Sequence, residues 1–233
     1  MLWIKICGTT NLVDACAALD AGANALGFIL TASPRQIALQ LAAEIIRELP
    51  PSTEKIGVVA NEPSETLRHL AETLGLTGFQ LHGNEPPDQI SEFRRTLGLR
   101  KIIKTLHMRE LLAEPAKLDA YLANAASIDG FLLDSGSAST LGGTGNAFDW
   151  KSALPLVDRI KQNKPVIVAG GLNPDNVGAA IRLFEPCGVD VVSGVEISPG
   201  TKDPARLRAF IAAARAAANS ISYSRNSSRG VPS

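Results

Sequence analysis

The sequence predicts a protein of the α/β class, a single (β/α)8 TIM barrel with its active site at the C-terminal rim of the strands. Three observations predict this fold. Eight short apolar runs recur along the chain, helical patterns alternate with them, and a length of 233 residues suits one such barrel.

The eight runs are rich in apolar and β-branched residues, as β-strands are. Several are apolar along nearly their whole length, which is typical of strands buried on both faces. The expected strands cover residues 3–7, 25–29, 55–60, 78–81, 101–106, 130–134, 165–170 and 189–194.

Helix signals occupy the segments between these runs. Residues 11–22 begin with an asparagine suited to N-capping and end with glycine, and residues 64–75 begin with serine and end with glycine. Residues 173–184 and 203–218 each begin with a polar or acidic residue and carry proline in the first turn.

Strict alternation of strand and helix requires parallel strands joined by crossover helices. Eight such units match a closed barrel, whereas an open doubly wound sheet has about five to seven strands. Alternation alone does not separate the two, but the first strand–helix turn lacks the G-x-G-x-x-G fingerprint of the open dinucleotide-binding sheet. We therefore predict the barrel.

The barrel is expected to span residues 1–218 as one catalytic domain. Residues 219–233 are polar, rich in Ser, Arg and Gly, and lack apolar periodicity. We expect them to form a disordered tail.

Composition excludes several function classes. The 23 basic and 23 acidic side chains balance to a formal net charge of zero, so no nucleic-acid partner is expected. No apolar run approaches the ~18 residues of a membrane span, and no membrane partner is expected. Three cysteines without metal-ligand spacing favour a reduced, cytoplasmic protein.

The C-terminal ends of barrel strands form one rim, which carries the active site. The predicted strands and the loops after them deliver the following residues there: Cys7, Arg35, His82, Asp134, Gly170, Gly171, Asp190, Ser193 and Gly194. These are the candidate site residues.

Cys7 and Asp134 form the pair best suited to proton transfer. A thiolate accepts a proton, and a carboxylic acid kept protonated donates one. The residues alone leave open a simpler interpretation, in which Cys7 fills apolar space and Asp134 caps a loop.

Glycines after the last two expected strands favour an anion site, because backbone N–H groups there can approach an oxyanion closely. The candidates are Gly170 and Gly171, followed by Ser193 and Gly194. Tight turns without a ligand are the alternative.

Three further side chains have open roles. Arg35 offers a fork of donors for a carboxylate or phosphate, or forms a surface ion pair. His82 either binds substrate or hydrogen-bonds within the rim, and it has no cluster of neighbours in the sequence to form a metal site. Asp190 lies in an apolar strand and needs a partner or a ligand.

These residues also carry a family resemblance. The motifs "KICGTT", "GFILTASPR", "QLHG", "LLDSGS…GGTGNAFDW", "AGGLNPDNV" and "GVDVVSGVEISPGTKD" occur in this order, from about residue 3 to about residue 210. In this combination the chain resembles the phosphoribosylanthranilate isomerases of tryptophan biosynthesis.

The resemblance implies a (β/α)8 barrel that catalyses the Amadori rearrangement of N-(5-phosphoribosyl)anthranilate to 1-(2-carboxyphenylamino)-1-deoxyribulose 5-phosphate. Cys7 would be the general base, Asp134 the general acid, and Arg35 the partner of the anthranilate carboxylate. Phosphate would lie against Gly170–Gly171 and Ser193–Gly194, with Asp190 near the polar groups of the substrate. No cofactor and no metal are implied, and the only expected ligand is a small phosphorylated substrate.

The chain departs from the family at one position of interest. The family often has two serines where this chain has Val192–Ser193, so one hydroxyl near the expected phosphate is absent. The expected state of assembly is a monomer or a homodimer.

Three other functions remain open. A histidine-pathway sugar isomerase performs the same chemistry, but with two aspartates where this chain presents Cys7 and Asp134. A Schiff-base aldolase would need an inward lysine, for which Lys5 and Lys104 are candidates. A phosphate-binding barrel without catalysis is a third possibility.

Overall fold

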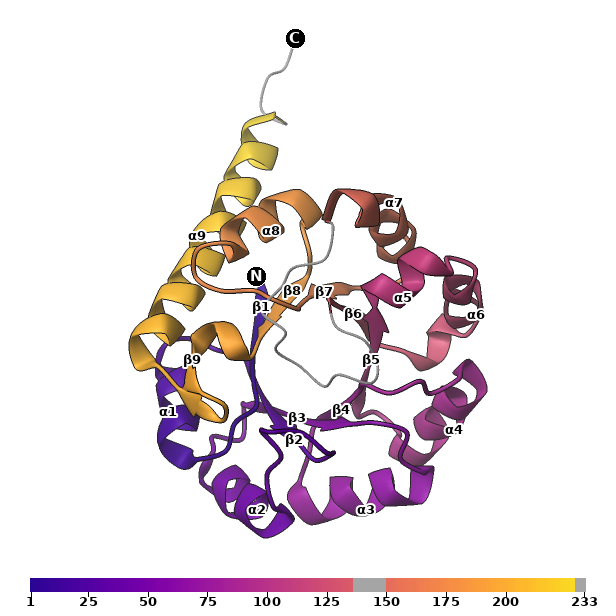
Figure 1. The fold of residues 1–233 in the computed structure, drawn as a ribbon, viewed down its shortest axis with the longest axis vertical. Helices are drawn as coiled ribbons and strands as arrows, with labels where there is room; N and C mark the ends of the chain where they lie inside the picture. Colours follow the sequence, from indigo (N-terminus) through magenta and orange to yellow (C-terminus); the bar gives the residue numbers. More distant parts are fainter. Residues whose placement is uncertain (136–149, 229–233) are drawn as a thin grey trace.

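Eight parallel strands close into a barrel in sequence order, β1 to β8, with β8 paired to β1. The computed structural model describes residues 1–135 and 150–228, and Figure 1 looks along the barrel. The prediction of a (β/α)8 barrel is confirmed. Its strands are β1 Trp3–Cys7, β2 Ala25–Ile29, β3 Glu54–Val59, β4 Gly78–Leu81, β5 Lys101–His107, β6 Gly130–Asp134, β7 Val166–Val168 and β8 Gly188–Val191.

Three strands end earlier than expected, β3 by one residue, β7 by two and β8 by three. After β7 the chain turns at Gly170 and Gly171, whose φ angles of 75° and 69° are left-handed and incompatible with a strand. After β8 the residues Ser193–Val195 form a short 3-10 helix, η2. Both changes bend the chain over the rim.

A ring of helices covers the outside of the barrel (Figure 1). The first, α1, begins after Asn11, whose side chain accepts a hydrogen bond from the Asp14 amide at 2.8 Å, as expected for an N-cap. The other helices are α2 Leu39–Glu48, α3 Ser64–Leu74, α4 Pro87–Leu97, α5 Met108–Ala113, α6 Lys117–Ala123, α7 Trp150–Lys161, α8 Val177–Phe184 and α9 Pro204–Ser228, with α1 at Leu12–Asp20 and the 3-10 helix η1 at Ala125–Ser127.

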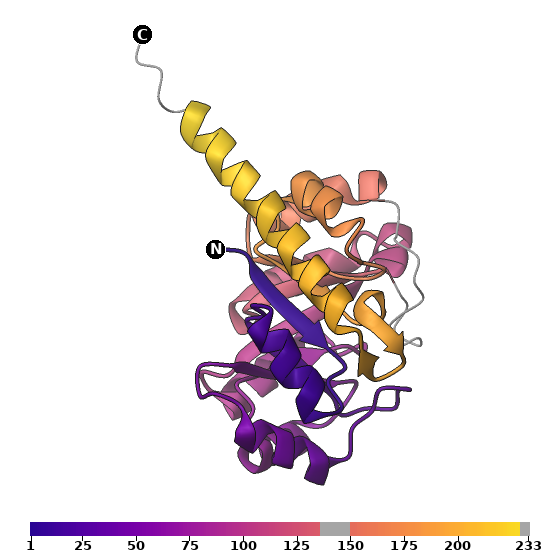
Figure 2. The same cartoon turned by 90° about the vertical axis from the view of Figure 1, so that its left-hand side faces the viewer.

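The last helix is longer than the sequence predicted. We expected a disordered tail from residue 219, but the backbone of α9 stays helical to Ser228. An alanine-rich run propagates the helix, and Ile221 still packs against the core. Figure 2 shows the end of α9 projecting beyond the barrel. Residues 229–233 lie outside the described residues.

Side chains alternate between the two faces of each strand. On β1, Ile4 and Ile6 belong to the large core between the barrel and its helices, whereas Lys5 and Cys7 belong to the opposite face, inside the barrel. The floor of the interior is apolar, where Trp3 packs against Ile103, Leu132, Ile167 and Ala169. Polar groups inside the barrel therefore gather above this floor, towards the rim.

A β-hairpin follows η2 and was not predicted. It pairs β9 (Glu196–Ser198) with β10 (Thr201–Lys202) in antiparallel fashion, and its register places Lys202 opposite Glu196. Between the strands stand Pro199 and Gly200, the latter with φ of 82°. Proline followed by a glycine with positive φ is the sequence that a type II turn requires.

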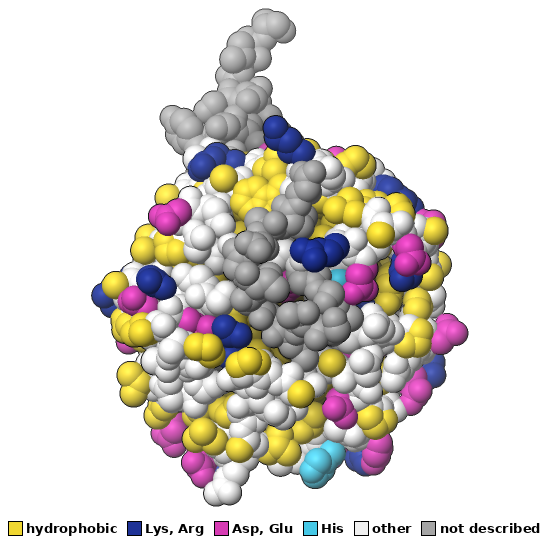
Figure 3. All heavy atoms as spheres, in the orientation of Figure 1, with side chains coloured by type: hydrophobic (Ala, Val, Ile, Leu, Met, Phe, Trp, Pro, Cys, Tyr) yellow, Lys and Arg dark blue, Asp and Glu magenta, His cyan; other side chains and the backbone are white. Residues whose placement is uncertain are grey.

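The surface carries no large field of one sign on the face drawn in Figure 3, where basic and acidic side chains are interspersed. This agrees with the balanced composition. Within the described ranges, no helix is both long and apolar enough to cross a membrane.

Replacing Gly188 with alanine tests the register of β1 and β8. A Cβ at Gly188 would lie 2.9 Å from both the Trp3 ring and the Trp3 carbonyl oxygen, so Gly188→Ala should lower the free energy of unfolding by about 1–3 kcal/mol. Urea denaturation measures this change. The control is Gly178→Ala within α8, where the nearest atoms belong to the flexible end of Arg182 and helix propensity should raise stability by ~0.5–1 kcal/mol. Unchanged stability of Gly188→Ala would contradict the register.

Candidate functional site

Cys7 ends β1 inside the barrel and is 2% exposed. Its sulfur lies over Gly27 of the neighbouring strand β2, where an added Cβ would come within 2.5 Å of Sγ. Ile29, Val58 and Val192 complete its surroundings. Burial raises the pKa of the Cys7 thiol above its ordinary range, although the positive charges of Lys5 and Lys202 counteract part of the rise.

Lys5 and Asp190 form an ion pair within the barrel, two residues below Cys7 on the same strand face. Lys5 Nζ lies 2.6 Å from Asp190 Oδ1, and the two residues are direct neighbours in the β1–β8 register. Burial alone lowers the pKa of the Lys5 ammonium, but attraction to Asp190 and Cys7 outweighs it, so this pKa lies above its ordinary value. Asp190 therefore has the partner that the sequence required, and it keeps a positive charge near the thiol.

Asp134 ends β6, on the same rim as Cys7, and is half-buried. Its neighbour in the register is His107, at the end of β5. The expected motif "GGTG" after Asp134 lies outside the described residues.

A polar cluster occupies the ends of β4 and β5. His82 Nδ1 lies 3.3 Å from Gln80 Nε2 and 3.4 Å from Thr105 Oγ1, and His107 Nε2 lies 2.9 Å from the His82 carbonyl oxygen. Burial, together with the charges of His107 and Lys104, lowers the pKa of His82 to about 3. His82 is thus uncharged at neutral pH.

Three buried atoms of this cluster have no hydrogen-bond partner in the described part of the chain: Gln80 Oε1, His82 Nε2 and His107 Nδ1. Buried polar atoms without partners are costly in a folded protein, and they are common where a ligand supplies the missing bond. The sequence analysis did not include His107 among the candidate site residues. Like His82, it directly follows a predicted strand, and that position could have identified it.

The glycines expected to bind an anion come together between the ends of β7 and β8. Gly170, Gly171, Asp190 and Ser193 line one small cavity there. Gly194 does not line it, but its absent side chain lets the two loops meet, since a Cβ would lie 1.9 Å from the Leu172 carbonyl oxygen. Four of the predicted site residues thus share one groove.

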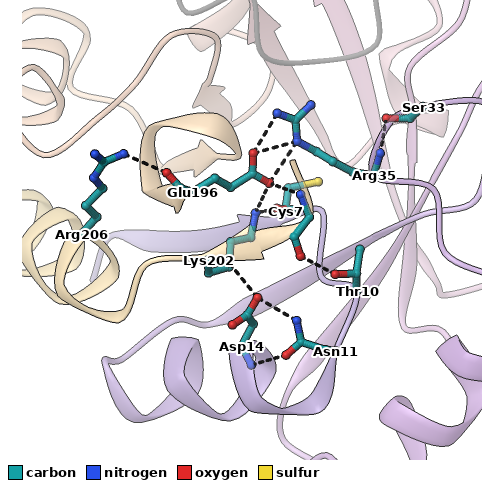
Figure 4. Close-up of polar contacts among 10 residues, drawn as sticks. Cys7, Thr10, Asn11, Asp14, Ser33, Arg35, Glu196, Lys202 and Arg206 are labelled. Atoms are coloured by element: carbon teal, nitrogen blue, oxygen red, sulfur yellow. Dashed lines mark hydrogen bonds and ion pairs between the residues drawn. The ribbon is translucent and has the colours of Figure 1, made fainter. Parts of the chain in front are cut away.

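Arg35 is held in a buried ion pair rather than lying free at the rim. Its guanidinium donates from Nε to both oxygens of Glu196, at 3.0 and 2.9 Å, and from Nη2 to Oε2 at 2.8 Å (Figure 4). One expected alternative was an ion pair at the surface. Arg35 does form an ion pair, but a buried one, because its side chain is only 7% exposed. Glu196 and Lys202 stood in a quoted motif, but the sequence analysis assigned no role to either.

No group of three His, Cys, Asp or Glu side chains suited to a metal ion occurs among residues 1–135 and 150–228.

Known proteins share both this sequence and this fold. The family model of N-(5'phosphoribosyl)anthranilate (PRA) isomerase matches residues 4–213. The N-(5'-phosphoribosyl)anthranilate isomerase of Pelobacter propionicus is 44% identical over 217 residues, which are 92% of this chain and 96% of that protein.

Two solved structures are similar over 93% of this chain and 100% of theirs. The dimeric phosphoribosylanthranilate isomerase of Thermotoga maritima, crystallised as monomers, is 33% identical with a TM-score of 0.76. A phosphoribosyl anthranilate isomerase in complex with reduced 1-(o-carboxyphenylamino)-1-deoxyribulose 5-phosphate is 34% identical, also with a TM-score of 0.76. Because the family match spans nearly the whole barrel, the chain belongs to the N-(5'-phosphoribosyl)anthranilate isomerase family.

Proposed function

We propose that the chain performs the isomerase reaction of its family with Asp134 as general acid and Cys7 as general base. The substrate is N-(5-phosphoribosyl)anthranilate, and the reaction is an Amadori rearrangement that serves tryptophan biosynthesis. The observation that carries the proposal is the arrangement of the two groups: both end barrel strands at one rim, and a buried ammonium, Lys5, lies near the thiol.

The reaction begins at the ring oxygen of the ribose. Asp134 donates a proton to this oxygen while the lone pair of the anthranilate nitrogen opens the ring to a protonated Schiff base. Asp134 suits this step because it is half-buried, open enough to meet a substrate that enters at the rim.

Cys7 completes the rearrangement as the base. Its thiolate removes the proton from C2, which gives an enolamine. The ketone forms when C1 gains a proton and the C2 hydroxyl loses one. One proton has then passed from Asp134 to Cys7, and exchange with solvent restores both groups. The charges of Lys5 and Lys202 favour the thiolate that this step needs.

Other residues hold the two ends of the substrate. The backbone around Gly170–Gly171 and Ser193–Gly194 would receive the phosphate, as glycines with exposed N–H groups do in related sites. Arg35 would meet the anthranilate carboxylate with the donors that Glu196 leaves open. His82 is neutral and has an unpartnered Nε2, which suits a hydrogen bond to an uncharged substrate group.

The Schiff-base alternative is disfavoured by the state of its lysines. Such a lysine must be a neutral amine to attack a carbonyl. Lys5 is held in its charged form by Asp190. Lys104 is paired with Glu85 at 2.7 Å, and this pairing favours its charged form against the burial that lowers the pKa of the ammonium.

Assembly and location belong to the same proposal. A homodimer is supported by a dimeric relative from Thermotoga maritima, and a monomer remains compatible with the fold. A cytoplasmic location is supported by three free cysteines, Cys7, Cys16 and Cys187.

Replacing Cys7 with serine should abolish most turnover. The hydroxyl has nearly the same size but is a far weaker acid, so kcat should fall by ~10²–10⁴-fold while the fold is kept. The assay follows the loss of anthranilate-type fluorescence from freshly generated substrate. Cys16→Ser is the control, since Cys16 is an exposed free cysteine on α1, and it should react at the wild-type rate. Wild-type activity in Cys7→Ser would remove Cys7 from the mechanism.

Ionisation of the Cys7 thiol should still be rising with pH beyond neutrality. Cys7 acts only when deprotonated, and burial raises its pKa above the ordinary value of about 8.5. Below that pKa the thiolate fraction grows about tenfold per pH unit, so the ultraviolet absorbance of the thiolate, taken as wild type minus Cys7→Ser, should climb through pH 7 and past pH 8.

His82 should add no step to this profile near pH 6.5, because its pKa is lowered to about 3. Titration of the thiolate absorbance from pH 5.5 to 9.5, wild type minus Cys7→Ser, tests both statements. A plateau reached below pH 7 would contradict the raised pKa of the thiol.

A further inference from the structure

Glu196 is the centre of a buried charge network that joins two candidate site residues. Its carboxylate receives hydrogen bonds from Arg35, from Lys202 Nζ at 3.0 Å and from the Gly200 amide at 3.2 Å. Glu196 is 5% exposed and Lys202 is 2% exposed. Figure 4 shows the carboxylate between the two cations. The hairpin β9–β10 creates this arrangement, because its register places Lys202 opposite Glu196.

Glu196 is ionised despite its burial. Burial alone would raise its pKa, but the hydrogen bonds and charges of Arg35 and Lys202 lower the pKa of this carboxyl below its ordinary value. A carboxylate paired with two cations is strongly held, and removal of its charge leaves both cations uncompensated.

Lys202 extends the network to Cys7. Its ammonium donates to the Cys7 carbonyl oxygen at 2.6 Å, and its backbone amide donates to Asp14 Oδ2 at 2.8 Å in the first turn of α1. The end of β1 and the start of α1 are thus both attached to the hairpin.

Glu196 binds the guanidinium group of Arg35 along one of its edges. Glu196 uses Nε and one N–H of Nη2, and within the described residues no hydrogen bond is formed by Nη1. The other edge, formed by Nη1 and the second N–H of Nη2, keeps the fork geometry that pairs with a carboxylate. Gly8, with φ of 71°, makes room for this side chain, since a Cβ there would lie 3.1 Å from Arg35 Cδ.

We propose that Glu196 is a positioning residue for substrate recognition: it orients Arg35 towards the carboxylate of the substrate and, through Lys202, ties that arginine to the backbone of Cys7. The inference rests on the role of Arg35 given under the proposed function. It adds a specific expectation, namely that loss of Glu196 weakens recognition of the carboxylate more than recognition of any other part of the ligand.

The test compares two ligands that differ only in the carboxylate. One is reduced 1-(o-carboxyphenylamino)-1-deoxyribulose 5-phosphate, and the other is the same compound with an unsubstituted phenyl ring. Their dissociation constants are measured by titration calorimetry for wild type and Glu196→Gln. We expect Glu196→Gln to bind the carboxylate ligand ~10–100-fold more weakly, as for loss of a charge-assisted contact, and to bind the phenyl ligand within about threefold of wild type.

Glu85→Gln is the matched control. Glu85 forms a second buried Lys–Glu pair, with Lys104 on the far side of the barrel. The side chains of Glu85 and Lys104 are as buried as those of Glu196 and Lys202. It also accepts backbone N–H groups, from Gly83 and Asn61. Glu85 does not contact Arg35, so its replacement should change the affinity for both ligands by the same factor. This control measures the effect of losing a buried ion pair without a role in carboxylate recognition.

The outcomes are distinct. Equal loss for both ligands in Glu196→Gln would overturn the positioning role while the proposed function stands. A wild type that binds both ligands equally would overturn the role of Arg35 and this inference together. Should Glu196→Gln fail to fold, Glu196→Asp keeps the charge but withdraws it by one methylene. The same selective loss is then expected in smaller degree, and its absence in a folded Glu196→Asp would equally overturn the inference.

Discussion

Closure of eight parallel strands is the constraint on which the rest of this structure depends. Once the barrel is closed, the alternation of side chains assigns every strand residue either to the outer core or to the interior. On β1 this places Ile4 and Ile6 against the helices, and Lys5 and Cys7 inside. The apolar floor around Trp3 fills the lower interior, so polar interior residues have space only towards the rim.

Burial of charge follows from this arrangement, and each buried charge described above has an opposite partner. Desolvation of a single ion costs several kcal/mol, which only a close partner offsets. Lys5 pairs with Asp190, Lys104 with Glu85, and Glu196 with both Arg35 and Lys202. The ammonium groups of Lys5 and Lys202 lie near Cys7. The ion pairs that stabilise buried charge therefore also determine the electrostatic surroundings of the thiol.

The Cys7 thiol is subject to two opposed effects. The apolar contacts that fix its position, with Gly27 beneath the sulfur and Val58 beside it, also raise its pKa by burial. The positive charges of Lys5 and Lys202 act against this effect. A base that must be both well positioned and ionised is thus served by residues from β1 and from the hairpin after β8.

The sequence by itself determined the fold class and the bounds of part of the strands. Four strand ranges, 3–7, 25–29, 78–81 and 130–134, agree with the structure, because strand and helix periodicities are local properties of the backbone. Placement of Cys7 and Asp134 at strand ends followed from the same periodicity. The helical course of residues 219–228 was missed because polar composition outweighed the helix propensity of the preceding alanines.

Only the tertiary structure decided which charges meet. Arg35 and Glu196 are 161 residues apart, Lys5 and Asp190 are 185 apart, and Lys202 and Cys7 are 195 apart. No local pattern relates residues at such separations. They meet because closure brings β8 and the hairpin after it against β1, and this is the physical reason why the sequence showed the candidate catalytic residues but not the network that holds them.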